Sequence, residues 1–195
     1  MLSTIQFTKW LATKLVTARR LRACSLVTFA NDEKPQIDPT ALFKLSYGLF
    51  VVTAKYGDKD NGCISNSVFQ IASEPTKIAF SCQKENLTRE LIEKSGILNV
   101  SVLTESVPFE VIRHFGMQSG RDVDKFENCE VDVRAKNGVK YIPKYTNAFM
   151  SLKVTSSTDL GSHQLFICDI TESQVLSDEP SCTYAHYHKA IKKRF

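Results

Sequence analysis

The stretch LFVVTAKYGDKDNGCISNSVFQIA, residues 49–72, decides the fold class of this 195-residue chain. Its first part, LFVVTAKY at 49–56, is mostly β-branched or aromatic, a composition that favours extended backbone. The middle part, GDKDNG at 57–62, consists of residues that form turns. We therefore predict a strand at 49–56, a turn at 57–62 and a second strand at 63–72.

Strand and turn signals continue through the rest of the chain. Further strands are predicted at 77–82, 97–103, 130–134, 148–156 and 164–176. Turns are predicted at Glu74-Pro75, Asn137-Gly138 and 160–162. Short helices are predicted at 41–46, at 87–95 with Gly96 as its cap, at 107–115 and at 184–193. Because turns join most of the strands, a small antiparallel barrel is favoured over a doubly wound sheet.

The N-terminal residues differ in charge from the rest of the chain. Residues 1–31 hold five of the 25 basic residues and none of the 21 acidic ones, so the body is close to neutral. The body therefore lacks the basic excess of a nucleic-acid-binding surface, and no apolar run reaches the roughly 20 residues that span a membrane. Residues 1–37 are predicted to be an extension, either a mitochondrial-type transit peptide or an unstructured segment without a targeting signal. We expect an intracellular protein of the cytoplasm or of a mitochondrion-like organelle.

Six cysteines are spread along the chain, and no two of them form a C-x-x-C pair. This spacing argues against a structural zinc site or an iron–sulfur ligand set, and no H-E-x-x-H pattern occurs. We predict no metal site. Thiols in apolar stretches indicate a reducing compartment, and no redox role is assigned to Cys63 or Cys82.

One candidate binding site lies where the predicted strand 77–82 ends in a polar turn before the helix at 87–95. The first N–H groups of a helix have no partner within it and carry partial positive charge. Asn86 is a suitable N-cap, Thr88 offers a hydroxyl, and Lys84 and Arg89 add full positive charge. These residues form either a phosphate-binding site or, as is commoner for such a composition, only a capped helix start.

A second candidate site is the polar stretch within the predicted strand 63–72. Alternation along that strand gives one face with Ser65, Ser67 and Phe69. The opposite face then carries Asn66, Val68 and Gln70. Buried polar groups need partners, which a flat heteroaromatic ligand edged with N–H and C=O groups would supply. A strand with one solvated face explains the same pattern.

Five segments, in this order, resemble a single protein family: KLSYGLFVVTAKYGDKDNGCISNSVFQIASEP, FSCQKENLTRELI, NVSVL, PFEVIRHFGMQSGRDVDKF and DLGSHQLFICDI. From residue 38 to residue 189 the chain is similar to the flavin reductase-like family, in particular to the branch found alone or fused to rubredoxin domains. The resemblance implies that residues 38–195 form a mainly β, six-stranded antiparallel Greek-key split barrel with two or three short helices. It also implies a homodimer with FMN near the subunit interface.

Roles for nine residues follow from the resemblance, motif by motif. The isoalloxazine ring would be lined by Asn66, Ser67, Val68 and Gln70. The ribityl chain and phosphate would be held by Ser81, Lys84, Asn86 and Thr88, which makes a phosphate site the favoured interpretation of this helix start. His163 matches a histidine that relatives place near the reacting face of the flavin.

The resemblance implies an oxidoreductase that passes hydride from NADH or NADPH to the flavin. Electrons would continue to free flavin, oxygen, an iron complex or a partner protein. The alternative is a non-enzymatic FMN-binding electron carrier that a partner protein reduces. No rubredoxin-type cysteine pairs follow the domain, so a separate electron acceptor is expected.

Overall fold

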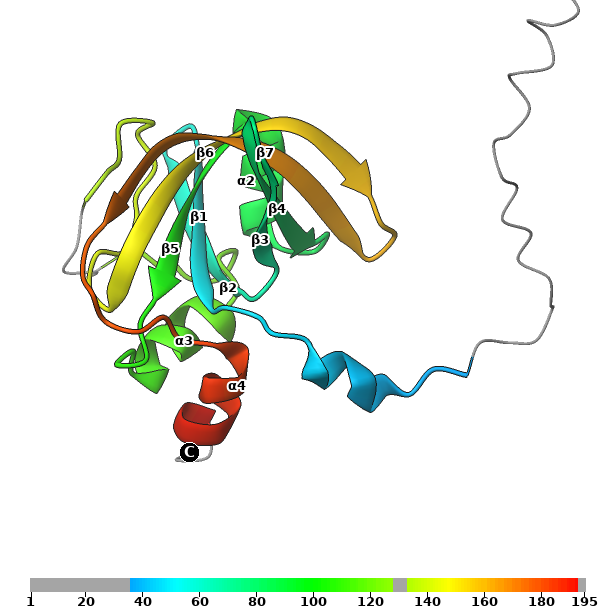
Figure 1. Cartoon of the computed structure of the whole chain (residues 1–195). Helices are drawn as coiled ribbons and strands as arrows, with labels where there is room; N and C mark the ends of the chain where they lie inside the picture. The colour runs from blue at the N-terminus through cyan, green and yellow to red at the C-terminus, as the bar shows by residue number, and fades with distance from the viewer. Residues whose placement is uncertain (1–35, 128–132, 193–195) are drawn as a thin grey trace, which may run out of the picture. The chain divides into compact units, whose positions relative to one another are not determined.

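The computed structural model describes residues 36–127 and 133–192 (Figure 1). The chain divides into two compact units, Met1–Pro39 and Thr40–Phe195, and the described strands all belong to the second. The predicted extension at 1–37 lies almost entirely outside the described residues. No helix in the described part of the chain is long and apolar enough to cross a membrane.

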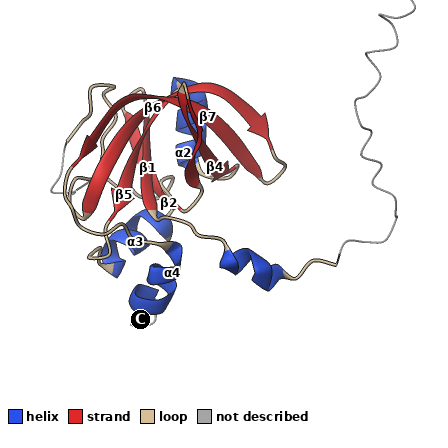
Figure 2. Cartoon of the chain, viewed as in Figure 1, coloured by secondary structure: helices blue, strands red, loops and turns tan. Residues whose placement is uncertain are grey.

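Within the described residues, antiparallel strands form one seven-stranded sheet in the order β2-β1-β5-β6-β7-β4-β3 (Figure 2). Their bounds are β1 Phe50–Tyr56, β2 Lys59–Ser65, β3 Val68–Ser73, β4 Thr76–Gln83, β5 Ile97–Leu103, β6 Thr146–Asp159 and β7 His163–Val175. Only Asn66 and Ser67 join the two edge strands β2 and β3, so the sheet must curl until its edges come close together. This confirms the mainly β, antiparallel split barrel, with seven strands in place of the predicted six.

The additional strand arises because the predicted strand 63–72 is broken after Ser65. The amide N–H of Ser67 donates to the Ser65 hydroxyl oxygen over 3.1 Å, a local bond that competes with strand pairing. The Ser81 N–H donates to the Ser67 carbonyl over 3.1 Å and holds this linker against β4. The predicted alternation of faces is therefore wrong beyond Ser65, and Asn66 and Ser67 form a linker instead of strand.

The turn between β1 and β2 is shorter than predicted. It consists of Gly57 and Asp58 alone, because Tyr56 already pairs with Lys59. Gly57 has a φ of 59°, a conformation that glycine adopts without strain. The predicted turn at 57–62 is therefore wrong for 59–62, which belong to β2 because Asn61 is buried and hydrogen-bonded there.

The helices are short. They are the 3₁₀ turn η1 Pro39–Lys44, α2 Leu87–Ser95, α3 Phe109–Gly116, α4 Tyr184–His186 and the π-helical turn η2 Tyr187–Ile191. The predicted α2 is confirmed with both caps, since Asn86 Oδ1 accepts the Thr88 N–H over 2.9 Å and Gly96 follows with a φ of 71°. Helix α3 begins two residues later than predicted because Pro108 is extended, with a ψ of 152°.

Two hydrophobic clusters lie on the two faces of β1, and this explains why its sequence is apolar throughout. Phe50 and Val52 belong to the cluster inside the barrel, which α2 completes with Leu91 and Ile92. Val51 belongs to the other cluster, which α3 and the C-terminal helical segment supply. Residues 130–132 of the predicted strand 130–134 lie outside the described residues, and the backbone of Arg134 pairs with that of Lys140 as an isolated β-bridge.

Candidate functional site

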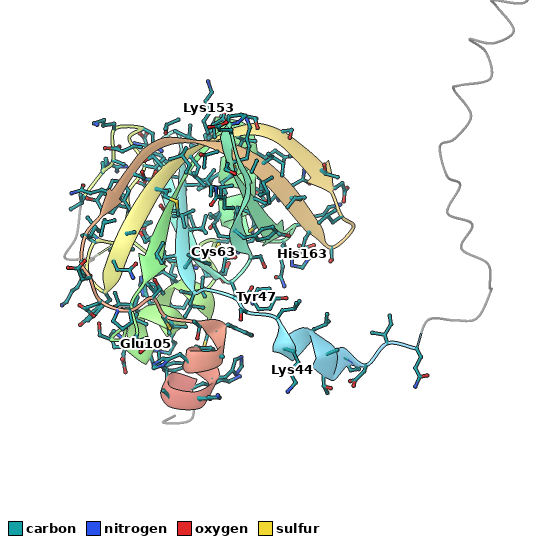
Figure 3. The ribbon with its side chains drawn as sticks, in the orientation of Figure 1. Lys44, Tyr47, Cys63, Glu105, Lys153 and His163 are labelled. Atoms are coloured by element: carbon teal, nitrogen blue, oxygen red, sulfur yellow. The ribbon has the colours of Figure 1, made fainter. Side chains whose placement is uncertain are left out.

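A pocket of about 430 Å³ lies where four segments of the barrel meet. These are the β2–β3 linker, the turn from β4 into α2, the loop after α3 and the start of β7. Figure 3 labels Cys63 and His163, which line the pocket from β2 and β7. Hydroxyl and amide side chains dominate the lining: Ser65, Asn66, Ser67, Ser81, Gln83, Asn86, Gln118 and Ser119. Pockets of this size bind small molecules and cofactors.

The pocket brings together five of the nine predicted site residues. They come from the linker, from β4 with the turn that follows it, and from the start of β7: Asn66, Ser67, Ser81, Asn86 and His163. His163 pairs with Gln83 across the β4–β7 ladder, and its Nδ1 lies 2.8 Å from the Ser162 hydroxyl oxygen. That contact orients the ring, so Nε2 is the nitrogen left for a ligand.

The other four predicted site residues do not line the pocket. Val68 is buried in the barrel cluster, and Gln70 is exposed, with its Nε2 donating to the Ala72 carbonyl. Lys84 directs its ammonium to Asp159 at 2.6 Å. Thr88 is fully buried, and its hydroxyl oxygen accepts the Asn61 amide over 2.9 Å.

The turn that leads into α2 is held in place by hydrogen bonds to the backbone of Lys84. Arg89 donates to the Lys84 carbonyl through Nε at 3.0 Å and through a terminal nitrogen at 2.6 Å. The Lys84 N–H donates to the Ser162 carbonyl over 3.1 Å. The positive end of the α2 dipole therefore faces the pocket beside Asn86, as the sequence predicts.

Lys125 supplies a positive charge that the sequence interpretation did not include. Its side chain is 3% exposed and lines the pocket, and its ammonium donates to the carbonyls of Gly62 and Phe115 at 2.9 and 2.8 Å. Among the described residues no carboxylate pairs with it, and its third N–H has no protein acceptor. Burial lowers the pKa of this ammonium, and the charge of the Cys63 thiolate acts in the opposite direction.

The loop after α3 holds Lys125 in place through the next residue, Phe126, and through the Lys125 carbonyl. Phe126 is buried in the cluster beneath α3, where its ring packs on Phe115 with centroids 5.7 Å apart. The Lys125 carbonyl lies 2.7 Å from His114 Nε2. Further back in the same loop, the guanidinium of Arg121 pairs with Glu90 on α2. That ion pair ties the loop to the helix on the far side of the pocket.

Two thiols line the pocket. Cys63 on β2 and Cys82 on β4 are each 4% exposed. Hydrogen bonding by the Cys82 thiol, and then by Thr88 and Asn86 together with the charge of Lys125, outweighs burial and lowers the pKa of Cys63. The pKa of Cys82 is raised, first by its hydrogen bond to Cys63 and then by burial.

The loop after α3 passes so close to Asn61 that position 120 leaves no room for a side chain. A Cβ at Gly120 would come within 2.1 Å of Asn61 Oδ1, and the Asn61 amide is itself buried and bonded to Thr88. We expect Gly120→Ala to displace this amide and to lower the free energy of unfolding by at least about 1 kcal/mol. Urea denaturation measures the effect, with Ser119→Ala in the same loop as the control. Equal stability of the two variants would contradict the close packing of Gly120 on Asn61.

The fold and the pocket define a class of protein: a small split barrel with a polar pocket beside a helix N-terminus. The chain belongs to the flavin reductase-like family, since the family model described as "Flavin reductase like domain" matches residues 42–193. In the described part of the chain no three His, Cys, Asp or Glu side chains form a metal-binding group.

Two known proteins with similar sequences are named as redox proteins. The chain is 40% identical over 153 residues to a high molecular weight rubredoxin of Moorella thermoacetica, covering 78% of this chain and 66% of that protein. It is 37% identical over 152 residues to a ferric-chelate reductase (NAD(P)H) of Archaeoglobus fulgidus, covering 78% and 89%. The fold matches an FMN-binding protein from Thermus thermophilus with a TM-score of 0.65 at 18% identity, covering 75% of this chain and 80% of that one.

Proposed function

We propose that this chain is an FMN-binding flavin reductase that takes hydride from NADH or NADPH and passes electrons to a separate acceptor. The observation that carries the proposal is the pocket itself, in a chain of the flavin reductase-like family. It combines hydroxyl and amide groups, a helix N-terminus and one buried ammonium. A phosphorylated heteroaromatic ligand needs these groups, because its ring offers hydrogen-bonding edges and its phosphate carries negative charge.

The residues present fit FMN on the basis of their own unmet bonding. Lys125 lines the pocket, and the third N–H of its ammonium has no acceptor among the described residues. In our proposal, Asn86 and Ser81 at the start of α2 hold the phosphate and ribityl chain, with Lys125 adding charge from the opposite wall. Asn66 and Ser67 contact the edge of the ring, and His163 lies at its reacting face.

Bound FMN would supply the redox chemistry, accepting a hydride from the nicotinamide. The residues of the chain would hold and orient the bound cofactor. The β2–β3 linker and the β4–α2 turn form two walls with fixed backbone, and the Arg121–Glu90 ion pair keeps the third wall against α2. The polar walls orient the ring edges, and Lys125 offsets negative charge near the helix N-terminus.

The electron acceptor is proposed to be a diffusible molecule or a separate protein: free flavin, oxygen, an iron complex or a partner protein. The Archaeoglobus fulgidus relative named as a ferric-chelate reductase supports an iron complex as one of these acceptors. The cysteines of the described residues are free thiols, which supports a reducing intracellular compartment.

Anaerobic addition of NADH or NADPH to purified, FMN-loaded protein tests the reaction. We expect the flavin absorbance near about 450 nm, a property of the cofactor, to bleach with at least one donor in a stopped-flow trace. Bleaching only after addition of a reduced protein partner would instead identify an electron carrier. Failure to take up FMN at all would overturn the proposal.

We also propose a homodimer, and the outer edge of the sheet supports it. Edge strand β3 exposes Phe69 by 53% and Ile71 by 46%, and uncovered apolar edges of this kind favour pairing with another chain. We expect Phe69→Glu to shift the protein from dimer to monomer in sedimentation velocity. Val175→Glu, at a side chain 71% exposed, introduces the same charge and should leave the dimer intact. A monomeric parent protein would reject the dimer.

A further inference from the structure

The tip of the β6–β7 hairpin, residues 160–162, is joined to the β4–α2 turn at Lys84. The Lys84 N–H donates to the Ser162 carbonyl over 3.1 Å, and the Lys84 ammonium lies 2.6 Å from Asp159 Oδ2. His163, which lines the pocket, directly follows Ser162 (Figure 3). Lys84 therefore holds the hairpin on both sides of the tip that precedes His163.

The Asp159 carboxylate uses both of its oxygen atoms at this tip. Oδ1 accepts the Gly161 N–H over 2.7 Å, while Oδ2 pairs with the Lys84 ammonium. Gly161 has a φ of 85°, a conformation that glycine adopts without strain. The Leu160 N–H donates to the His163 carbonyl over 2.9 Å and closes the hairpin. One carboxylate thus fixes the shape of the tip and also attaches the tip to the β4–α2 turn.

The bonds at Lys84 lead to the His163 ring. His163 pairs with Gln83 in the last pair of the β4–β7 ladder, so the tip extends beyond the end of that ladder. His163 Nδ1 lies 2.8 Å from the Ser162 hydroxyl oxygen, and the carbonyl of the same serine accepts the Lys84 N–H. A shift of the tip relative to the β4–α2 turn therefore moves the ring within the pocket.

A second ion pair on the same two strands shows what is particular to Lys84 and Asp159. Lys77 and Asp169 pair at the other end of the β4–β7 ladder, where the strands already hold them opposite each other. The side chains of Lys84 and Asp159 are 37% and 62% exposed, and exposed ion pairs contribute little to stability. The effect of the Lys84–Asp159 pair therefore lies in the position of the hairpin tip.

We propose that Lys84 and Asp159 are positioning residues for His163, because their ion pair clamps the hairpin tip to the β4–α2 turn and so places the ring at the pocket. The inference rests on the proposed function, in which His163 lies at the reacting face of the flavin. It gives Lys84 a role other than the phosphate contact that the family resemblance implies. A misplacement of about 1 Å can slow a reaction by about a hundredfold.

Asp159→Asn removes the ion pair alone, because the amide oxygen can still accept the Gly161 N–H. We expect the rate constant for flavin reduction at saturating nicotinamide to fall by about tenfold. The dissociation constant for FMN should stay within about twofold of the parent value, since neither side chain lines the pocket. Stopped-flow bleaching measures the rate, and fluorescence quenching of FMN measures the dissociation constant.

Variants of Lys84 test whether the two side chains act as a pair. Lys84→Met should slow flavin reduction as much as Asp159→Asn does, and Lys84→Arg, which keeps the charge, should retain nearly the parent rate. The double variant should be no slower than either single one, because each removes the same interaction. If Lys84 bound the phosphate instead, Lys84→Met would weaken FMN binding and Asp159→Asn would strengthen it by releasing the ammonium. That result would overturn the proposal.

The position of His163 is also measured without flavin. In proton–nitrogen correlation spectra of the flavin-free full chain, we expect the His163 ring signals to shift or broaden in Asp159→Asn, with those of His114 unchanged. Asp169→Asn, which breaks the ion pair at the far end of the same strands, should leave the His163 signals and the reduction rate at parent values. Unchanged His163 signals in Asp159→Asn would overturn the clamp. Absence of bleaching in the parent protein would overturn the proposed function alone, because the ring signals need no cofactor.

Discussion

Lys125→Met is expected to raise the dissociation constant for FMN by about tenfold to a hundredfold. A hydrogen bond to a charged group contributes about 1.5–3 kcal/mol, and each 1.4 kcal/mol corresponds to about a factor of ten in affinity. Lys125 is the only lysine or arginine among the residues that line the described pocket. Because it is 3% exposed, solvent and salt screen its charge less than they screen that of a surface lysine.

Methionine keeps the length of the lysine side chain and removes its charge, so a loss of affinity reports on the charge. Fluorescence quenching of FMN measures the dissociation constant, and urea denaturation shows whether the barrel remains folded. The matched control is Lys136→Met, since Lys136 is 88% exposed and pairs with Glu172 at 3.3 Å. Unchanged FMN affinity in the Lys125→Met variant would show that the phosphate lies away from this wall.

Sequence alone predicted the features that depend on neighbouring residues. Helix α2 with its caps Asn86 and Gly96 follows from a few adjacent positions, and the structure confirms it. The family resemblance predicted Asn66, Ser67, Ser81 and Asn86 as site residues. All four line the pocket, because Asn66, Ser67 and Asn86 lie just beyond the ends of strands and Ser81 lies near the end of β4.

Features that depend on distant contacts were missed or misplaced. Lys125 lies in a polar loop far along the chain from Gly62, and only the packing of Phe126 under α3 carries its ammonium to β2. In the sequence, Lys125 was indicated only by its position near the end of the segment PFEVIRHFGMQSGRDVDKF, residues 108–126, which resembles the family. Asn61 was assigned to a turn because asparagine is rare in strands; its burial depends on Thr88, which only the fold brings near.

Thr88 shows why residue type alone does not define a role. Its hydroxyl was predicted to contact the phosphate, but the residue is fully buried and takes part in a chain of bonds beneath the pocket. The Asn61 amide donates to the Thr88 hydroxyl oxygen, and hydrogen bonding by Thr88 contributes to the lowered pKa of Cys63. A group in this position supports the pocket wall and the thiolate together.

Thr88→Val is therefore expected to lower the free energy of unfolding by about 2–3 kcal/mol. Valine has nearly the same shape, so the cost comes from the Asn61 amide, which loses its acceptor while its Oδ1 already lacks a partner among the described residues. Leaving a buried group unpaired costs about 1–3 kcal/mol, and the upper part of this range is expected because Asn61 is 1% exposed. Urea denaturation gives the value.

A threonine-to-valine substitution at an exposed position is the control. It shows how much of the change in the free energy of unfolding comes from the lost Asn61–Thr88 hydrogen bond and how much from valine itself. Thr155 donates to the Ile167 carbonyl over 3.0 Å at the surface, where water can replace the bond, so Thr155→Val should change stability by less than about 0.5 kcal/mol. Cys63 should also react more slowly with iodoacetamide in Thr88→Val, because the thiolate loses a donor, and at the parent rate in Thr155→Val. If Thr88→Val were as stable as Thr155→Val, the hydrogen bond from Asn61 to Thr88 would not exist in solution.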